Sequence, residues 1–390
     1  MPAIFPDFSA PTSASTSRAL GILVCERDGN PPFAESSFIK RLSLIGAGSG
    51  LELFAFAPWS WEEQSNLVKG WVWNKQKQRW DAARYTLPAV VYDRSWPVNK
   101  DEKIRFQQAI QRLQEAKRIT YLNNRMPHKG KIYEILSKDP SFQSILPPTA
   151  VYDGPSSLAL WLSRHNYAAF LKPIAGSQGK RVVAVVRKED GTVNIRGRQS
   201  DNRPLSINCV NEQAALRLLQ RWIGQRAYLM QPLLDLRGPE GEPLDLRALM
   251  QKNNNGHWTL TGIAARCGMP GTVTSNLHGG GKASSAKEVL VSLFGELRGI
   301  ELLQEIRRIS FQLVNRLEET LGRFAEIGMD YGIDRSGRIW FLEANSKPGR
   351  AAMESVGKAA AKLAAEQPLS YARSILLRPP GRVIHEFDHL

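Results

Sequence analysis

Residues 328–349, which read GMDYGIDRSGRIWFLEANSKPG, constrain the fold more than any other stretch of the chain. Apolar and polar residues alternate on both sides of the turn-rich tetrapeptide DRSG at residues 334–337, a pattern typical of a β-hairpin. Because successive side chains on a strand point to opposite faces, Glu343 and Asn345 share one face, and the turn places Asp330 roughly opposite Glu343. Two carboxylates and an amide carbonyl form the all-oxygen set that Mg²⁺ prefers. The hairpin is therefore either a metal site or an ordinary turn whose acidic side chains are solvated.

Size and composition restrict the class of protein. A chain of 390 residues exceeds the size at which one hydrophobic core usually stops growing, so two or three domains are expected. Its apolar content of 42% and charged content of 23% are those of a globular protein. The sequence shows no apolar stretch of roughly 18 residues or more, which argues against a membrane span. The start of the chain lacks the pattern of a secretory signal. The cysteines are widely spaced, which fits a reducing compartment and gives no zinc motif. We therefore expect a cytoplasmic protein.

The formal net charge of +15 is the one unusual bulk property. The excess of basic residues is spread along the chain without a block of like charges, so nucleic acid is not an expected partner. Two explanations of the charge remain open, a basic surface that faces anionic partners and a diffusely basic, well-solvated surface. An oligomer is compatible with the sequence.

The order of apolar patterns predicts the elements that precede the hairpin. Short apolar runs at residues 20–25, 51–57 and 87–92 are typical of buried strands, and helical and turn patterns separate them. This alternation predicts a small α/β unit at the start of the chain. Helical periodicity at residues 101–118 predicts a link to the next domain, and residues 287–324 form the longest predicted helical region.

A lysine and a glycine-rich turn follow a predicted strand in the middle of the chain. Lys172 precedes the tetrapeptide Gly176-Ser177-Gln178-Gly179, whose glycines would let backbone N–H groups approach phosphate oxygens closely. The turn is not a Walker A loop, because Ile174 stands where that motif requires glycine and Arg181 where it requires Ser or Thr. A plain hairpin turn would show the same residues.

A second loop, at residues 274–281, begins with Thr274-Ser275-Asn276 and ends with three consecutive glycines. Such glycines carry an entropic cost that a mere connection has no need to bear. Upstream, Asp245 and Arg247 alternate on one predicted strand, and Arg266 lies on the next. Arginine pairs suit a carboxylate or phosphate, because the guanidinium fork binds such groups through two parallel hydrogen bonds. Surface ion pairs are the alternative.

These motifs, taken in this order, resemble the ATP-grasp superfamily over about residues 121–350. The resemblance is closest to the enzymes that add glutamate to the tail of a ribosomal protein. The whole chain is similar to the endospore coat-associated YheC/YheD family through PAVVYDR at residues 88–94 and NSKPGR at residues 345–350. The implied fold class is α/β (α+β), an ATP-grasp fold with an N-terminal α/β domain. The implied divisions are a flexible tail (1–19), an N-terminal pre-ATP-grasp domain (20–120), a lid subdomain (121–228) and a C-terminal subdomain with the metal site (229–380).

The resemblance also implies roles for individual residues. Those implied to bind ATP are Lys131, Lys172, Gly176, Ser177, Gln178, Gly179, Gln231, Pro232, Leu233, Asp245, Thr274, Ser275 and Asn276. Those implied to hold Mg²⁺, or Mn²⁺ in its place, are Asp330, Glu343 and Asn345. One residue departs from the family pattern: Pro232 stands where an acidic residue usually follows Gln231, which leaves the adenine to backbone contacts.

The implied reaction joins a carboxylate to an amine at the expense of ATP, through an acyl phosphate. It requires positioning and charge neutralisation rather than a protein nucleophile. Arg247, Arg266 and Lys172 would act on the transferred phosphate and on the second substrate, a small carboxylate or a peptide. The alternative is a nucleotide-binding structural protein of the spore coat without ligase turnover. In both cases a spore-associated location would follow from the resemblance.

Overall fold

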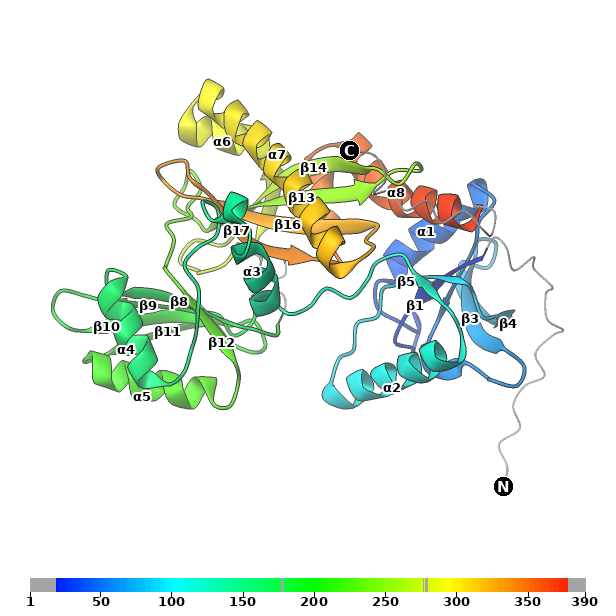
Figure 1. The fold of residues 1–390 in the computed structure, drawn as a ribbon, viewed down its shortest axis with the longest axis horizontal. Coiled ribbons are helices and arrows are strands. Elements are labelled where there is room, and N and C mark those ends of the chain that lie inside the picture. Colours follow the sequence, from blue (N-terminus) through cyan, green and yellow to red (C-terminus); the bar gives the residue numbers. More distant parts are fainter. Residues whose placement is uncertain (1–18, 177–178, 276, 278–279, 378–390) are drawn as a thin grey trace.

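Three sheets organise the structure, a computed structural model that describes residues 19–377 except 177–178, 276 and 278–279. They follow one another along the chain, and each has helices packed against it (Figure 1). The predicted mixed α/β fold is confirmed. None of the described helices combines the length and the apolar character needed to cross a membrane.

The first sheet has the strand order β4-β3-β2-β1-β5-β6. Its strands are β1 (Ala19–Leu23), β2 (Glu52–Phe56), β3 (Leu67–Asn74), β4 (Arg79–Thr86), β5 (Val90–Asp93) and β6 (Thr120–Tyr121). Strand β1 pairs in parallel with β2 and β5, and β5 with β6, so the carboxyl ends of these strands meet at one edge. Alternate residues of β1 enter separate cores, one with helix α1 (Ser36–Gly48) and one with helix α2 (Lys100–Ala116).

The second sheet is antiparallel, in the order β11-β10-β9-β8-β12-β7. Its strands are β7 (Ala150–Val151), β8 (Ala168–Pro173), β9 (Val183–Arg187), β10 (Val193–Arg198), β11 (Pro204–Cys209) and β12 (Tyr228–Gln231). Helices α4 (Pro155–Arg164) and α5 (Glu212–Ile223) share one apolar core with the sheet. On β8, Ala169 and Leu171 belong to that core. Because side chains alternate, Phe170 and Lys172 lie on the opposite face.

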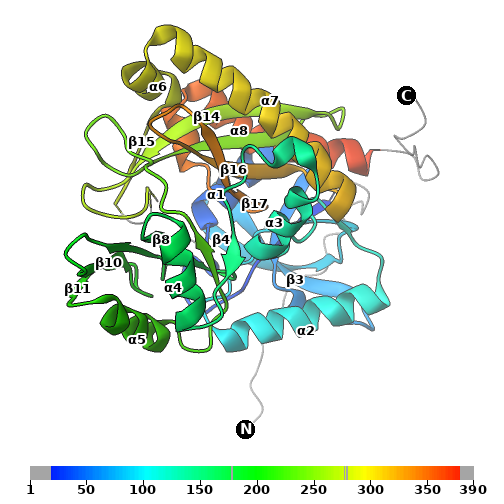
Figure 2. The same cartoon turned by 60° about the vertical axis from the view of Figure 1, so that its left-hand side comes forward.

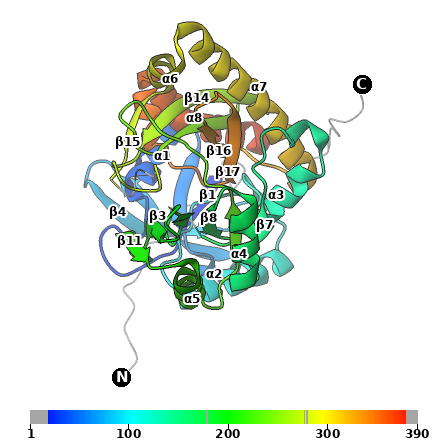
Figure 3. The ribbon, with the colours of Figure 1, turned by 90° about the vertical axis from the view of Figure 1, so that its left-hand side faces the viewer.

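The third sheet is also antiparallel, in the order β15-β14-β13-β16-β17. Its strands are β13 (Leu244–Lys252), β14 (Trp258–Cys267), β15 (Lys282–Ser285), β16 (Glu326–Ile333) and β17 (Ile339–Asn345). Helices α3 (Lys129–Ser137), α6 (Ala286–Phe294) and α7 (Glu296–Leu321) contribute to its core. Figure 2 and Figure 3 show α6 and α7 on the side of this sheet that faces away from the second sheet.

The predicted hairpin is confirmed as β16 and β17, and its register is the expected one. Asp330 lies opposite Glu343 and Gly328 opposite Asn345, with an irregularity just after Asp330. The helix predicted over residues 287–324 is instead two helices, separated at Gly295. This glycine has a φ of 81°, a left-handed conformation that ends α6 and that other residues rarely adopt.

Two helices each pack against a sheet that is distant from them in the chain order. Tyr133 of α3 donates hydrogen bonds to the carbonyls of Phe341 and Leu342 on β17, each at 3.0 Å, so α3 packs on the third sheet although it precedes the second. Helix α8 (Lys358–Leu376) contributes Leu369 and Tyr371 to the core that contains α1. Short 3₁₀ turns are η2 (Pro58–Ser60), η3 (Pro140–Phe142) and η5 (Ala351–Ser355).

Candidate functional site

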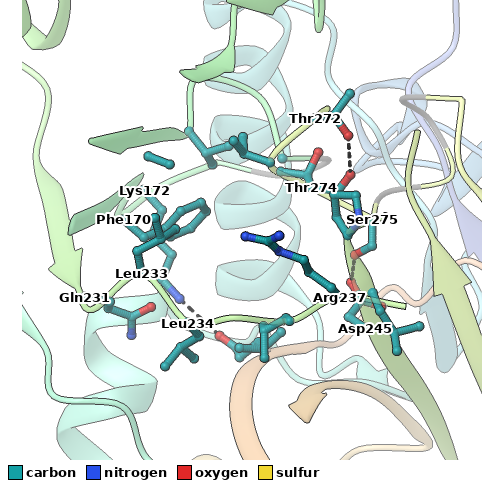
Figure 4. Close-up of a pocket in the computed structure, with 18 of the residues that line it drawn as sticks. Phe170, Lys172, Gln231, Leu233, Leu234, Arg237, Asp245, Thr272, Thr274 and Ser275 are labelled. Atoms are coloured by element: carbon teal, nitrogen blue, oxygen red, sulfur yellow. Dashed lines mark hydrogen bonds between the residues drawn. The ribbon is translucent and has the colours of Figure 1, made fainter. Parts of the chain in front are cut away.

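A cavity of about 580 Å³ lies between the second and third sheets, and both contribute to its walls. Phe170 and Lys172 come from β8, while Asp245, Arg266 and Asp330 come from β13, β14 and β16. The connection between the sheets, residues 231–237, completes one side (Figure 4). A cavity of this size can hold a small organic ligand.

Lys172 is the buried cation on the side of the second sheet. Its Nζ donates to the carbonyl of Leu342 at 3.1 Å and lies 3.4 Å from the hydroxyl of Tyr133. Burial, reinforced by repulsion from Lys129, lowers the pKa of Lys172 to about 7. Among the described residues no carboxylate forms an ion pair with this ammonium, so an anionic ligand in the cavity would stabilise its charge.

Lys129, rather than Lys131, is the lysine of α3 that lines the cavity. The Nζ of Lys129 lies 2.5 Å from Oε2 of Glu343. The predicted Lys131 instead donates to both carboxylate oxygens of Glu134, at 2.9 Å each, on the exposed side of the helix. Residues two apart on a helix do not share a face, so only one of these lysines can reach the cavity. The resemblance to the family implied Lys131 and did not single out Lys129.

The connection between the sheets holds Gln231, Pro232 and Leu233 against the cavity. The amide of Gln231 already donates to Oγ1 of Thr149 at 2.8 Å, so its side chain is engaged. Sequence reasoning missed Arg237 further along, whose guanidinium points into the cavity in Figure 4. No motif contains this residue, and only the path of the loop reveals it.

The wall of the cavity that the third sheet contributes is a cluster of buried charges on neighbouring strands. Arg266 lies opposite Asp245 in the sheet, and Arg247 lies opposite Asp330. Arg266 donates through Nη2 to Asp245 at 2.7 Å and lies 2.8 Å from Oδ2 of Asp330. Arg247 donates to both oxygens of Asp330, with Nη2 at 2.9 Å from Oδ2. Arg266 and Asp330 line the cavity, whereas Arg247 reaches Asp330 from outside the lining.

Burial and these ion pairs shift the pKa values of Asp245 and Arg266. Burial raises the pKa of the Asp245 carboxyl; Arg266 opposes this rise, and the charge of Asp330 adds to it. Burial acts to lower the pKa of Arg266, but the two carboxylates outweigh it and raise that pKa. Both arginines predicted to act on substrate are thus already paired with carboxylates, and only Arg266 faces the cavity.

The loop after β14 brings Thr274 and Ser275 to the cavity, beside the charged cluster. The hydroxyl of Ser275 donates to Asp245, which fixes the loop on the charged cluster. A Cβ at Gly268 would lie 2.3 Å from the carbonyl oxygen of Thr274, so only glycine permits this close approach. Of the predicted glycine-loop residues, Gly179 lines the cavity and Gly176 does not. The predicted Ser177, Gln178 and Asn276 lie outside the described residues.

The three predicted metal ligands are adjacent on the hairpin, and each already has a partner. Asp330 pairs with Arg247 and Arg266, Glu343 with Lys129, and Nδ2 of Asn345 donates to Oε1 of Glu343 at 3.1 Å. Burial alone would raise the pKa of Glu343, but the Lys129 ammonium holds it well below its usual range. In the described part of the chain, no group of three or more His, Cys, Asp or Glu side chains could hold a metal.

Comparisons with known proteins identify the family. The model of the YheC/D-like ATP-grasp family matches residues 118–375. The chain belongs to this family. Two relatives from Bacillus subtilis (strain 168) share most of its length. Endospore coat-associated protein YheD is 26% identical over 82% of this chain and 69% of its own. Endospore coat-associated protein YheC is 24% identical over 81% of this chain and 86% of its own.

Solved structures confirm the ATP-grasp fold of this family member. D-cycloserine synthetase matches with a TM-score of 0.51 and 14% identity, over 92% of this chain and 98% of its own. N5-carboxyaminoimidazole synthetase from Staphylococcus aureus, complexed with ADP, matches with a TM-score of 0.50 and 10% identity, over 90% and 77%. The D-alanine-D-alanine ligase from Coxiella burnetii has a TM-score of 0.50 and 10% identity, over 92% and 96%.

Proposed function

We propose that this protein is an ATP- and Mg²⁺-dependent ligase that joins a carboxylate to an amine. The observation that carries the proposal is the cavity between two sheets, with the buried Lys172 on one wall and the charged cluster of Asp245, Arg266 and Asp330 on the other. A buried lysine that forms no ion pair among the described residues faces the space that a nucleotide would fill. The ADP complex of the similar synthetase from Staphylococcus aureus supports nucleotide binding in a fold of this kind.

In this proposal, the phosphates of ATP lie against Lys172 and Lys129, below the turn that contains Gly179. The adenine lies against residues 231–233, where Pro232 offers no backbone donor and the side-chain amide of Gln231 is engaged with Thr149. Contacts with adenine then come from backbone groups and from the apolar surface of Leu233. Lys129 would exchange its bond with Glu343 for one with phosphate.

The residues of the hairpin fit a divalent cation in donor type and in register. Asp330 and Glu343 are cross-strand neighbours, and the amide oxygen of Asn345 completes a set of hard oxygen donors. Because only two of the three are carboxylates, the set is typical of a cation whose remaining ligands are phosphate oxygens. When bound, Mg²⁺ would neutralise phosphate charge. Arg247 and Arg266 orient Asp330 through their ion pairs.

The proposed reaction balances without a protein nucleophile. A carboxylate oxygen of the substrate attacks the γ-phosphorus of ATP, and the bond to the β-phosphate oxygen breaks with release of ADP. The amine nitrogen then attacks the acyl carbon, inorganic phosphate leaves, and the nitrogen loses a proton. Arg266 is placed to stabilise charge on the transferred phosphoryl group.

A nucleotide-binding structural protein of the spore coat, without ligase turnover, is the second candidate, because both relatives are named as endospore coat-associated proteins. Two measurements on the full chain separate the candidates. Calorimetry with ATP and Mg²⁺ should show binding, and ADP release should depend on an added carboxylate and amine. Absence of ATP binding would contradict both candidates. Binding without ADP release, across amino acids and peptides, would favour the structural role.

A further inference from the structure

A second cavity, of about 700 Å³, lies where the first sheet approaches the end of β17. One wall consists of residues that follow the parallel strands β5 and β6, including Ser95 and Asn123. The other wall consists of Ser346 and Lys347, directly after β17. Ligands of α/β sheets bind outside the carboxyl ends of parallel strands, so the position suits a ligand site as well as the size does.

The base of this cavity is preformed by hydrogen bonds. Lys347 donates through Nζ to Oδ1 of Asp93 at 2.7 Å and to the carbonyl of Ser95 at 2.9 Å. Asn123 donates to the carbonyl of Ser346 at 2.5 Å and to the carbonyl of Glu326 at 3.1 Å. The single acidic side chain of the lining, Asp93, is therefore neutralised by Lys347.

The remaining charged residues of the lining are all basic: Lys100, Lys103 and Arg125. Within the described chain, none of the three forms an ion pair with an acidic side chain. Glu102, on the same helix as the two lysines, is instead paired with Arg27 at 3.0 Å. Part of the high net charge is thus concentrated around one cavity, where it remains uncompensated.

The second cavity adjoins the first through one strand. Glu343 lines the first cavity and Ser346 lines the second. Three residues of extended backbone span roughly 10 Å. A ligand of moderate length in the second cavity therefore has its inner end beside the hairpin to which the proposed function assigns phosphoryl transfer.

We propose that the second cavity binds a small organic acid with at least two carboxylates, which serves as the second substrate of the ligase. One carboxylate pairs with Lys100, Lys103 and Arg125, and the rest of the molecule extends along the base toward Ser346. That this acid is a substrate rests on the proposed function. That the cavity binds a multiply charged acid rests on the charges of the cavity alone.

The test measures binding without nucleotide. Citrate, glutarate, butyrate and pyrophosphate are titrated into the full chain by calorimetry at matched ionic strength. Citrate and glutarate should bind at least about tenfold more tightly than butyrate, the effect of one charge-assisted contact. Lys103→Glu and Arg125→Glu should each weaken citrate binding by at least about tenfold. Lys117→Glu is the matched control, because this exposed lysine caps the far end of α2 and does not line the cavity.

Three results would overturn the proposal: citrate binding no tighter than butyrate, equal losses in Lys103→Glu and Lys117→Glu, or binding of pyrophosphate alone. ATP affinity, measured on the same samples, keeps the two proposals apart. Normal ATP binding without acid binding overturns only the site proposed here. Acid binding without ATP binding overturns the ligase function and, with it, the role of this acid as a substrate.

Discussion

Strand β16 carries two buried carboxylates four residues apart, and only one of them lines the cavity between the second and third sheets. Asp330 and Glu326 are both almost inaccessible, and each is held by two arginines. Asp330 opens onto the cavity between the second and third sheets. Glu326 faces the first sheet instead and lines neither of the two cavities described above.

The cluster around Glu326 joins the first sheet to the third. Tyr92 of β5 donates a hydrogen bond to Glu326, and Gln251 of β13 donates another at 2.9 Å. Arg350 donates to both carboxylate oxygens, and Arg94 lies 3.6 Å away. Buried ion pairs occur in both clusters, so burial and pairing alone do not distinguish a candidate site from a structural contact. A charged cluster becomes a candidate for chemistry when part of it faces a space that a ligand can enter.

Glu326→Gln is the substitution with the largest expected effect. It leaves Arg350 buried without a compensating carboxylate, whereas Arg94 keeps its ion pair with Glu35. Removing one partner of a buried ion pair typically costs about 3–5 kcal/mol. Urea denaturation should show this loss. Glu301→Gln is the control, because Glu301 is an exposed partner of Arg298 and should change stability by less than about 1 kcal/mol. Equal midpoints for the two variants would contradict the structural role of the Glu326 cluster.

Glu343→Gln should act on the reaction rather than on the fold. The amide keeps the shape of the side chain but removes the charge that would hold a divalent cation, so ADP formation should fall by at least about a hundredfold. Stability should change much less than in Glu326→Gln, since the bond to Lys129 is partly exposed. The Mg²⁺ dependence of ATP affinity should also disappear in this variant. Retention of that dependence, or a similar loss in the exposed Glu354→Gln, would exclude Glu343 as a ligand.

The hairpin could be predicted because its information is local. Alternation and one turn are sufficient to set the register of Asp330 against Glu343, as the structure confirms. The break between α6 and α7 also had a local signal, Gly295 itself. It was not used, because helical periodicity on both sides of this glycine indicated one continuous helix. Helix α8 was not predicted, and Pro368 within it is a local signal against a helix. The helix forms because it packs against elements that are distant in sequence.

The partners of Asp330 could not be predicted, because Arg247 and Arg266 come from strands that are distant in sequence from β16. Asp245, Arg266 and Asp330 meet only when β13 lies between β14 and β16. From the sequence, the arginines were expected to bind substrate or to form surface ion pairs. The structure shows buried pairs, one of which faces the cavity.

Lys172→Met should weaken ATP binding while the fold is retained. Methionine preserves the length of the side chain, and loss of one charge-assisted contact should cost about 1.5–3 kcal/mol of binding free energy. Stability should not fall much, because the substitution also removes a buried charge that has no carboxylate partner. Calorimetric titration of wild type and variant provides the measurement, with the exposed Lys188→Met as control. Equal ATP affinity in all three proteins would remove Lys172 from the site.

The smallest expected effect is a difference between the two lysines of α3, and it tests which of them contacts the nucleotide. Lys129→Ala should weaken ATP binding by about 0.5–1.5 kcal/mol, less than Lys172→Met, because Lys129 is partly exposed and must leave Glu343 to reach a phosphate. Lys131→Ala should leave ATP affinity unchanged, because its ammonium pairs with Glu134 on the other side of the helix. The two variants remove the same charge only two residues apart, so a general electrostatic effect on the nucleotide would weaken both equally. A larger loss for Lys131→Ala would mean that α3 presents its other face to the nucleotide when ATP binds.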